Sequence, residues 1–383
     1  MIERVLRKNE QNVAVAAKEP LYLSDLEQLE LMVRYTQTHA SYREDQKFER
    51  EMACLRVLFP RVFRPMYEDD LIVGRYDSLP IGFGSVTSVG APGHYCRFDQ
   101  VEKMKKRVKG EKDDVLNELM EYWKIHDTRE VFYRDNLVEN VSGRFVDVLY
   151  PMIVTARFSG MYLDYNLLLD HGIDGLKEVI SLKKRDLPAS STLYDAMIDA
   201  LKLLSETIHH HIQEVEIKLI NQQLSPKRRR QMERLLTALK QIEHGKPNSM
   251  ISAMQLAWLY SSMAGVVNFG RMDDYLGDYL VSDLKSGRLS EQDANDLIES
   301  QWRLIEVKRT NVNGRVIVGG KGRRNEENAD VFCKLAIEST KRAQLVEPQF
   351  TLRFYEGMDP EIMDKALESI ATGVTHERHR ELR

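Results

Sequence analysis

The chain has 383 residues, of which 43% are hydrophobic and 30% are charged, so it can bury a core and stay in solution. Lys and Arg number 55 against 59 Asp and Glu, and the net charge of −4 argues against a nucleic-acid or membrane surface. No apolar run approaches the roughly 20 residues that a membrane span needs. The charged N-terminus MIERVLRKNEQN lacks a signal-peptide core. We therefore expect a cytoplasmic protein.

Three cysteines, Cys54, Cys96 and Cys333, are few, odd in number and widely spaced. This pattern fits a reducing compartment and argues against a disulfide framework. No Cys/His cluster has metal-ligand spacing, so no metal site is expected. Cys54 is interpreted as a small core residue. Cys96 follows His94 by two positions, and the alternative for it is a reactive thiol, if that imidazole lowers its pKa.

Helical and irregular segments alternate through the first part of the chain. Residues 22–56 have apolar positions at helical spacing, which predicts a helix. Residues 59–98 are richer in Pro and Gly and carry the short apolar run 71–74, so loops and short extended pieces are expected. Residues 99–146 return to a charged, helical composition.

The clearest helix begins near Ser191, because apolar side chains then recur every three or four residues. This stripe consists of Leu193, Met197, Leu201, Leu204, Ile208, Ile212, Val215 and Leu219. Ser225 and Pro226 are suited to the N-cap and first position of the next helix. The strongly apolar residues 250–264 predict a buried helix.

The last third of the chain predicts an α/β unit, because helical and extended patterns alternate. The expected elements are a helix from Ser290 with a capping contact to Asp293, a strand over 315–320, a helix over 328–343, a strand over 349–355 and a helix from Asp359-Pro360 to about Thr372. If residues 315–355 did not form parallel strands, an α-rich binding protein would be favoured instead.

The most informative stretch is GVVNFGRMDDYL at 265–276, where an apolar run ends in Gly-Arg and a helix carries Asp-x-Tyr-Leu onward. With other motifs in the same order, it makes the chain resemble the glycyl radical enzymes of the pyruvate formate-lyase family. The motifs that carry this resemblance are 69–74, 122–124, 164–176, 256–289, 319–326 and 348–353.

The resemblance implies an α/β fold: a helix-rich part over 1–249, then the first strands of a ten-stranded α/β barrel over 250–375, and a divergent tail over 376–383. Family members are usually homodimers. Their chemistry uses a C-terminal glycine, which a separate radical S-adenosylmethionine activase converts to a stored radical. It also uses a barrel-loop cysteine that becomes a thiyl radical. A dry, closed cavity protects both radicals.

The family's cysteine loop should follow the segment that ends near Gly373, but residues 374–383 resemble nothing in the family. No cysteine here has a matching context, and the C-terminal Arg-Val-x-Gly-aromatic segment is absent. We therefore assign no catalytic residue and no bound cofactor. The chain is interpreted as the truncated N-terminal portion of a radical lyase or dehydratase. It would be inactive unless a downstream polypeptide completes the barrel, with a homodimer and an activase as further expected partners. The alternative is a non-catalytic fragment or an interaction module that associates with a full-length homologue.

The resemblance also implies candidate site residues. Dehydratase members carry Gly-His where this chain has Gly160-Met161, and His-Ser where it has Gly265-Val266. Pyruvate formate-lyase places a substrate-holding Arg near position 160, and Arg157 is a neighbouring candidate. The expected pocket residues are Arg157, Gly160, Met161, Gly265, Val266 and Asn268, and the structural motif residues are Gly270, Arg271, Asp273 and Tyr275. Arg271 and Asp273 are expected to form a buried ion pair, with a role in the barrel wall or the dimer as the alternative.

Three polar clusters receive mainly structural interpretations. The histidines at 209–211 point in different directions from one helix, which predicts a solvated face and no shared metal. The basic residues 227–230 are expected to contact acidic neighbours or solvent. The loop at 323–326 follows a strand, so structural bonding is expected, with substrate or partner contact as the alternative.

Overall fold

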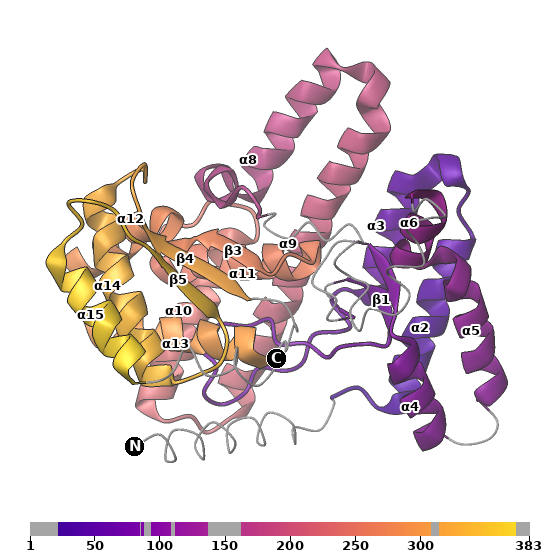
Figure 1. Ribbon diagram of the computed structural model, residues 1–383, viewed down its shortest axis with the longest axis horizontal. Coiled ribbons are helices and arrows are strands. Elements are labelled where there is room, and N and C mark those ends of the chain that lie inside the picture. The colour runs from indigo at the N-terminus through magenta and orange to yellow at the C-terminus, as the bar shows by residue number, and fades with distance from the viewer. Residues whose placement is uncertain are drawn as a thin grey trace.

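The computed structural model describes residues 22–84, 86–87, 93–108, 112–136, 162–307 and 314–372. Helices dominate, and they surround two small sheets at different places in the molecule (Figure 1). One sheet pairs β1 with β2 in the N-terminal helical region. The other orders three parallel strands as β3-β4-β5. The second sheet positions the candidate site.

The N-terminal region contains α2 (Asp25–Ala40), η1 (Glu44–Gln46), α3 (Lys47–Leu58), β1 (Ile81–Phe83), β2 (His94–Cys96), α4 (Phe98–Val108), α5 (Asp113–His126) and α6 (Thr128–Asn136). The single helix expected over 22–56 is wrong, because the chain breaks after Ala40. Ser41 caps α2 by donating its amide hydrogen to Gln37 and Thr38. The polar residues that follow offer no apolar side chain that would continue the buried stripe.

The extended run expected at 71–74 is not a strand. Its backbone bonds to a helix instead: the Val73 amide donates to Gln255 Oε1 at 2.8 Å, and the Val73 carbonyl accepts from Gln255 Nε2 at 3.1 Å. At Gly74, with φ +111°, a Cβ would lie 2.6 Å from the Trp258 indole nitrogen. The segment is therefore held against a helix of the core and does not join a sheet.

Helices α8 (Tyr165–Asp186) and α9 (Ser191–Asn221) form a hairpin joined by η3 (Pro188–Ser190), and it projects from the body of the molecule (Figure 1). Helix α9 begins at the predicted residue, and its apolar stripe is buried from Leu201 to Val215. The outer end of the stripe is not core, because Leu193 and Met197 are 37% and 42% exposed near the tip of the hairpin.

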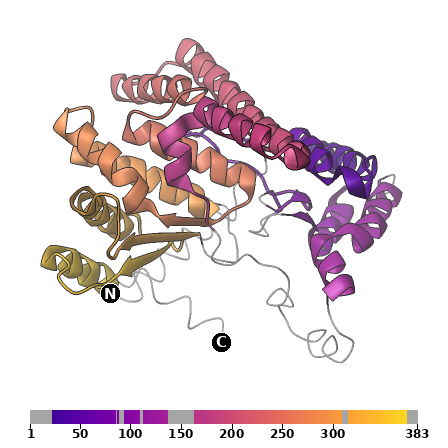
Figure 2. The same ribbon diagram turned by 90° about the horizontal axis from the view of Figure 1, so that it is seen from above.

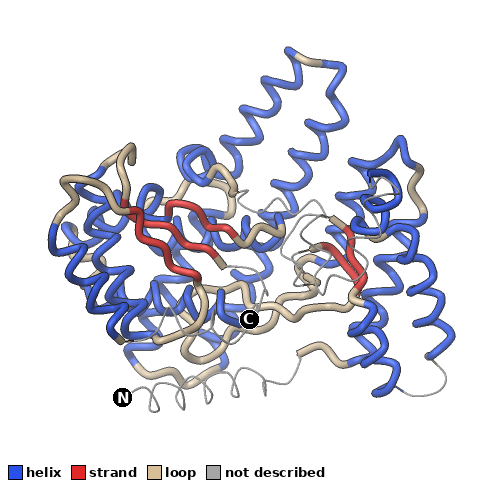
Figure 3. Tube along the Cα trace, in the orientation of Figure 1, coloured by secondary structure: helices blue, strands red, loops and turns tan. Residues whose placement is uncertain are grey.

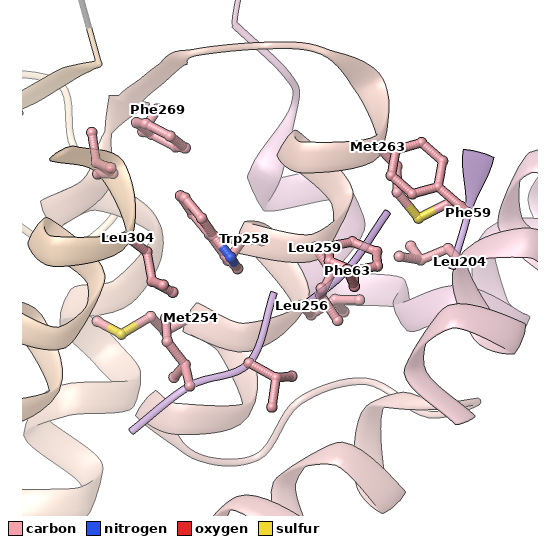
Figure 4. Packing of buried hydrophobic residues seen from close by; sticks show 14 of the residues in the cluster. Phe59, Phe63, Leu204, Met254, Leu256, Trp258, Leu259, Met263, Phe269 and Leu304 are labelled. Atoms are coloured by element: carbon pink, nitrogen blue, oxygen red, sulfur yellow. The ribbon is translucent and has the colours of Figure 1, made fainter. Parts of the chain in front are cut away.

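Helices α10 (Pro226–Ile242) and α11 (Met250–Ala264) follow. The predicted cap of α10 is confirmed, since the Ser225 hydroxyl accepts a hydrogen bond from the Arg228 amide. Helix α11 is buried almost along its whole length, as its composition predicted. Its Trp258 stacks on Phe269, with ring centroids 5.8 Å apart, and so joins α11 to the first parallel strand (Figure 4).

The C-terminal region alternates β3 (Asn268–Arg271), α12 (Met272–Lys285), α13 (Glu291–Val307), β4 (Arg315–Gly319), α14 (Glu326–Ala343), β5 (Gln349–Arg353) and α15 (Pro360–Ala371). The predicted helix and strand alternation is confirmed, and the predicted contact between Ser290 and Asp293 caps α13 in both directions. The strands are parallel, which disfavours the α-rich alternative. Strand β3 was not separated from the apolar run before it, because four residues give too short a pattern.

The two faces of the parallel sheet differ. Val316 and Val318 of β4 are fully buried on one face, where Figure 2 shows the described helices gathered. Arg315, Ile317 and Thr351 lie on the opposite face and are at least partly exposed. Figure 3 shows the three strands in front of the helices, with no described helix over this second face. We call it the open face.

Candidate functional site

The approach to β3 is set by the end of α11. Gly265 closes the helix in a left-handed conformation, with φ +74°, which an L side chain rarely adopts. The next amide, from Val266, donates to the Ser261 carbonyl at 3.2 Å, and Val266 is buried. The chain then enters the sheet at Asn268. The expected pocket residues Gly265, Val266 and Asn268 are thus brought to the amino-terminal edge of the parallel sheet.

The other expected pocket residues, Arg157, Gly160 and Met161, lie outside the described residues. Their spatial relation to Gly265 and Val266 therefore stays a prediction.

A row of polar side chains crosses the open face at this edge. Asn268 of β3 is in register with Arg315 of β4, and Arg315 is in register with Gln349 of β5. The Asn268 side-chain oxygen accepts from the Gly270 amide at 3.1 Å, and the Gln349 side-chain oxygen accepts from Arg315 Nη2 at 3.5 Å. The sequence interpretation missed Arg315 and Gln349. The alternation of polar and apolar residues in QFTLR, at 349–353, was the signal for an exposed strand face.

The opposite edge of the sheet holds a buried charge cluster. Asp273 accepts from the Gly319 amide at 2.8 Å and from Arg323 Nη1 at 3.1 Å, and both side chains of this ion pair are fully buried. Burial raises the Asp273 pKa to about 6, and the Gly319 amide and Arg323 oppose that rise. Arg323 also pairs with Asp330 at 2.7 Å.

The expected ion pair between Arg271 and Asp273 is wrong. Arg271 instead donates to the carbonyl oxygens of Gly319, Gly320 and Lys321, at 2.7, 3.1 and 3.0 Å. It thereby fixes the turn that follows β4. Arg271 is the last residue of β3, whereas Asp273 lies in the first turn of α12, so the two side chains leave the backbone from different elements and reach different partners.

Gly270 and Tyr275 shape the end of β3. Gly270 has φ +60°, and a Cβ there would lie 3.2 Å from the Tyr162 ring. The Tyr275 hydroxyl donates to the Phe269 carbonyl at 3.0 Å, and its ring stacks on Tyr165 at 4.6 Å. Both residues thus contact other parts of the chain at the end of β3.

The loop at 323–326 is also engaged in structural bonds. The Arg324 amide donates to Asp274 at 2.6 Å, and its guanidinium forms an ion pair with Asp170 of α8 at 2.6 Å. The Gly322 amide donates to Glu326 Oε1 at 2.8 Å. Carboxylates of the chain itself thus accept hydrogen bonds from backbone amides that could otherwise bind an anion.

The other clusters are mostly ordinary. His211 corrects the expectation of a solvated face, because it is fully buried and bonds Glu214 at 3.1 Å. In the basic segment, Lys227 lies 4.0 Å from the acidic Asp296, as expected, whereas Arg228 donates to the backbone carbonyl of Asp70 at 2.8 Å. Cys54 is buried, as expected. A reactive Cys96 is not supported, because burial raises its pKa to about 12.

Within the described part of the chain, no group of three or more His, Cys, Asp or Glu side chains could hold a metal ion. No described helix is both long and apolar enough to cross a membrane.

The fold and this edge of the sheet define a class: α/β proteins in which consecutive β-α units build one parallel sheet against a helical body. A family model described as pyruvate formate lyase-like matches residues 2–376. The chain therefore belongs to the pyruvate formate lyase-like family.

Relatives agree with this assignment. The chain is 23% identical over 290 residues to the (2S)-3-sulfopropanediol dehydratase of Klebsiella oxytoca, covering 69% of this chain and 34% of that protein. A glycyl radical enzyme from Archaeoglobus fulgidus matches with a TM-score of 0.68 and 18% identity. The glycerol-bound form of the B12-independent glycerol dehydratase from Clostridium butyricum matches with a TM-score of 0.72 and 16% identity. Each structural match covers 97% of this chain and 50% of the other, so the chain spans between a third and a half of these proteins.

Proposed function

We propose that this chain is the N-terminal portion of a glycyl radical enzyme of the lyase or dehydratase class, and that a second polypeptide completes its barrel. The second polypeptide would supply the thiyl cysteine and the radical glycine, and a radical S-adenosylmethionine activase would install the radical. The chain alone would be inactive.

The observation that carries the proposal is that one edge of the parallel sheet is uncovered by described residues. Strand β5 lies at the edge of the parallel sheet, with no described strand beyond it. Phe354, directly after β5, is 68% exposed. On α15, Leu367 and Ile370 lie three residues apart on one side of the helix and are 56% and 49% exposed. A free strand edge beside exposed apolar side chains is the surface that another β-α unit would cover.

The names of the relatives support the dehydratase class within this proposal, since two of the three compared proteins are dehydratases. Gly265 and Val266 argue against the dehydratase class, because dehydratases of the family carry His-Ser at these two positions. A His can move a proton during loss of water, and neither Gly nor Val can. Another residue of the completed site would have to perform that step.

Anaerobic electron paramagnetic resonance tests the proposal. The chain is incubated with an activase that is active on another family member, with and without the product of the downstream reading frame. A glycyl doublet that appears only with the downstream product supports the split enzyme. Absence of the doublet in both samples contradicts it and favours the alternative, a non-catalytic fragment or interaction module. Co-purification with a full-length homologue distinguishes that module from a decayed fragment.

A further inference from the structure

The polar row on the open face offers more hydrogen-bond donors than acceptors. The side-chain oxygens of Asn268 and Gln349 already accept hydrogen bonds, from the Gly270 amide and from Arg315. These contacts orient both amide groups, so their NH₂ groups are the ends left to face a ligand. Between them lies a guanidinium with five N–H donors. Three neighbouring strands thus present donors at one level of the sheet.

The guanidinium of this row forms no ion pair within the described part of the chain. Arg315 has no carboxylate within 4.0 Å among them, although many other arginines of the chain are in ion pairs. Glu347, an acidic residue at the same edge, accepts a hydrogen bond from the Gln349 amide at 3.1 Å. A partly exposed guanidinium beside two outward amide donors matches a group with two or three oxygens that share a negative charge.

The row lies next to the expected pocket. The Arg315 amide donates to the Val267 carbonyl at 3.0 Å, so β4 is bonded directly to the segment that follows Gly265 and Val266. Those two residues have no polar side chain with which to orient a substrate. The nearest polar side chains on the adjoining strands are in the row itself, which is therefore placed to perform that function.

We infer that Asn268, Arg315 and Gln349 form an oxyanion subsite, so that the substrate of the completed enzyme carries a carboxylate or sulfonate group. Arg315 holds the negative charge, and the two amide groups fix its orientation. This inference rests on the proposed function for its meaning as substrate recognition. The binding itself does not require a radical, an activase or a second polypeptide.

The test follows individual arginine side chains by nuclear magnetic resonance. The full chain is labelled with ¹⁵N-arginine, and the Nε–Hε signal of Arg315 is assigned by its loss in Arg315→Gln. Acetate and methanesulfonate are titrated at constant ionic strength, with 1,2-propanediol as the neutral probe. Arg353 is the matched control, since it lies exposed on the same face of the sheet at the other edge.

The expected result is that an anion shifts the Arg315 signal at about tenfold lower concentration than it shifts the Arg353 signal, as two added hydrogen bonds predict. The neutral diol should leave Arg315 unmoved. Gln349→Leu should remove most of the difference while leaving the thermal midpoint within a degree or two. If acetate shifts Arg315 more strongly than methanesulfonate, the subsite selects a carboxylate, and the reverse order selects a sulfonate.

Equal shifts at Arg315 and Arg353 would overturn the inference, because they would mean that anions only condense on exposed cations. Equal response to the diol would do the same. A selective anion shift without a glycyl radical signal would leave the subsite standing while refuting the split enzyme, so the two failures are distinguishable.

Discussion

Gly277 lies where α12 crosses α14, and the contact leaves no room for a side chain. A Cβ at this position would lie 2.9 Å from the backbone nitrogen and Cα of Ala329 and 2.9 Å from the carbonyl carbon of Asn328. Backbone atoms cannot rotate away as the end of a flexible side chain can. Helix α12 is joined to the parallel sheet, since it follows β3 directly and its Asp273 accepts from the Gly319 amide of β4. Helix α14 is tied to the same cluster by the ion pair of Asp330 with Arg323.

Gly277→Ala brings two opposing effects. Replacing a glycine inside a helix by alanine contributes about 1 kcal/mol of helix propensity. Overpacking a tight contact costs about 1–3 kcal/mol. Since all three nearest atoms belong to the backbone of α14 and the sheet resists separation, we expect overpacking to exceed propensity. Taking overpacking in the upper part of its range, about 2–3 kcal/mol, the net effect should be a loss of about 1–2 kcal/mol in the free energy of unfolding.

Urea denaturation followed by circular dichroism measures this loss. The control is Gly175→Ala in α8. A Cβ at Gly175 would lie 3.3 Å from the Cβ of His171, which is one turn earlier in the same helix, and would not meet another helix. That variant should be neutral or gain up to about 1 kcal/mol from propensity. The reasoning is refuted if Gly277→Ala is as stable as the wild type while Gly175→Ala behaves as expected.

Three further predictions concern charge and surface. Burial, and to a smaller extent the nearby His94, lowers the His39 pKa from 6.5 to about 3. The free energy of unfolding should therefore fall as pH drops from 6.5 toward 3, because in this range only the unfolded imidazole binds a proton. His39→Gln should flatten this part of a profile of thermal midpoint against pH. The Asp273 pKa is raised from 3.8 to about 6, so its titration stabilises the fold below pH 3.8 and this stabilisation is lost as pH rises through 6. Asp273→Asn should remove this fall in the thermal midpoint with rising pH. If the wild-type and Asp273→Asn profiles run parallel, the raised pKa of Asp273 is contradicted. We also expect the chain alone to self-associate through the surface formed by β5 and α15. Leu367→Gln should weaken this association in sedimentation velocity without lowering the thermal midpoint, because Leu367 is 56% exposed. Unchanged association would show that α15 is not the contact surface.

Much of the helical structure could be predicted because its signals are local. The N-caps Ser225 and Ser290 bond within three residues of themselves, so the sequence contains both partners. The buried helix over α11 followed from composition alone. The ends of helices were harder to predict. Helix α2 ends at Ala40 because of which residues pack against the core, and no short sequence pattern contains that information.

The site divides in a similar way. The family and the motif at 265–276 were visible in the sequence, and alternation in β5 contained a signal for an exposed strand face. The pairing of Asp273 with Arg323 was not visible, because 50 residues separate them and the choice between Arg271 and Arg323 depends on how β3 meets β4.

The sequence by itself therefore determined most of the described helices, the β-α alternation and the family, all of which rest on periodicity and ordered short motifs. Only the tertiary structure decided which side chains meet. It placed Asn268, Arg315 and Gln349 in one row and left the other end of the α9 stripe, at Leu193, outside the core. The reason is physical: strand register and helix packing join residues that are distant in the chain, and a single residue of register shift moves a side chain to the other face of the sheet.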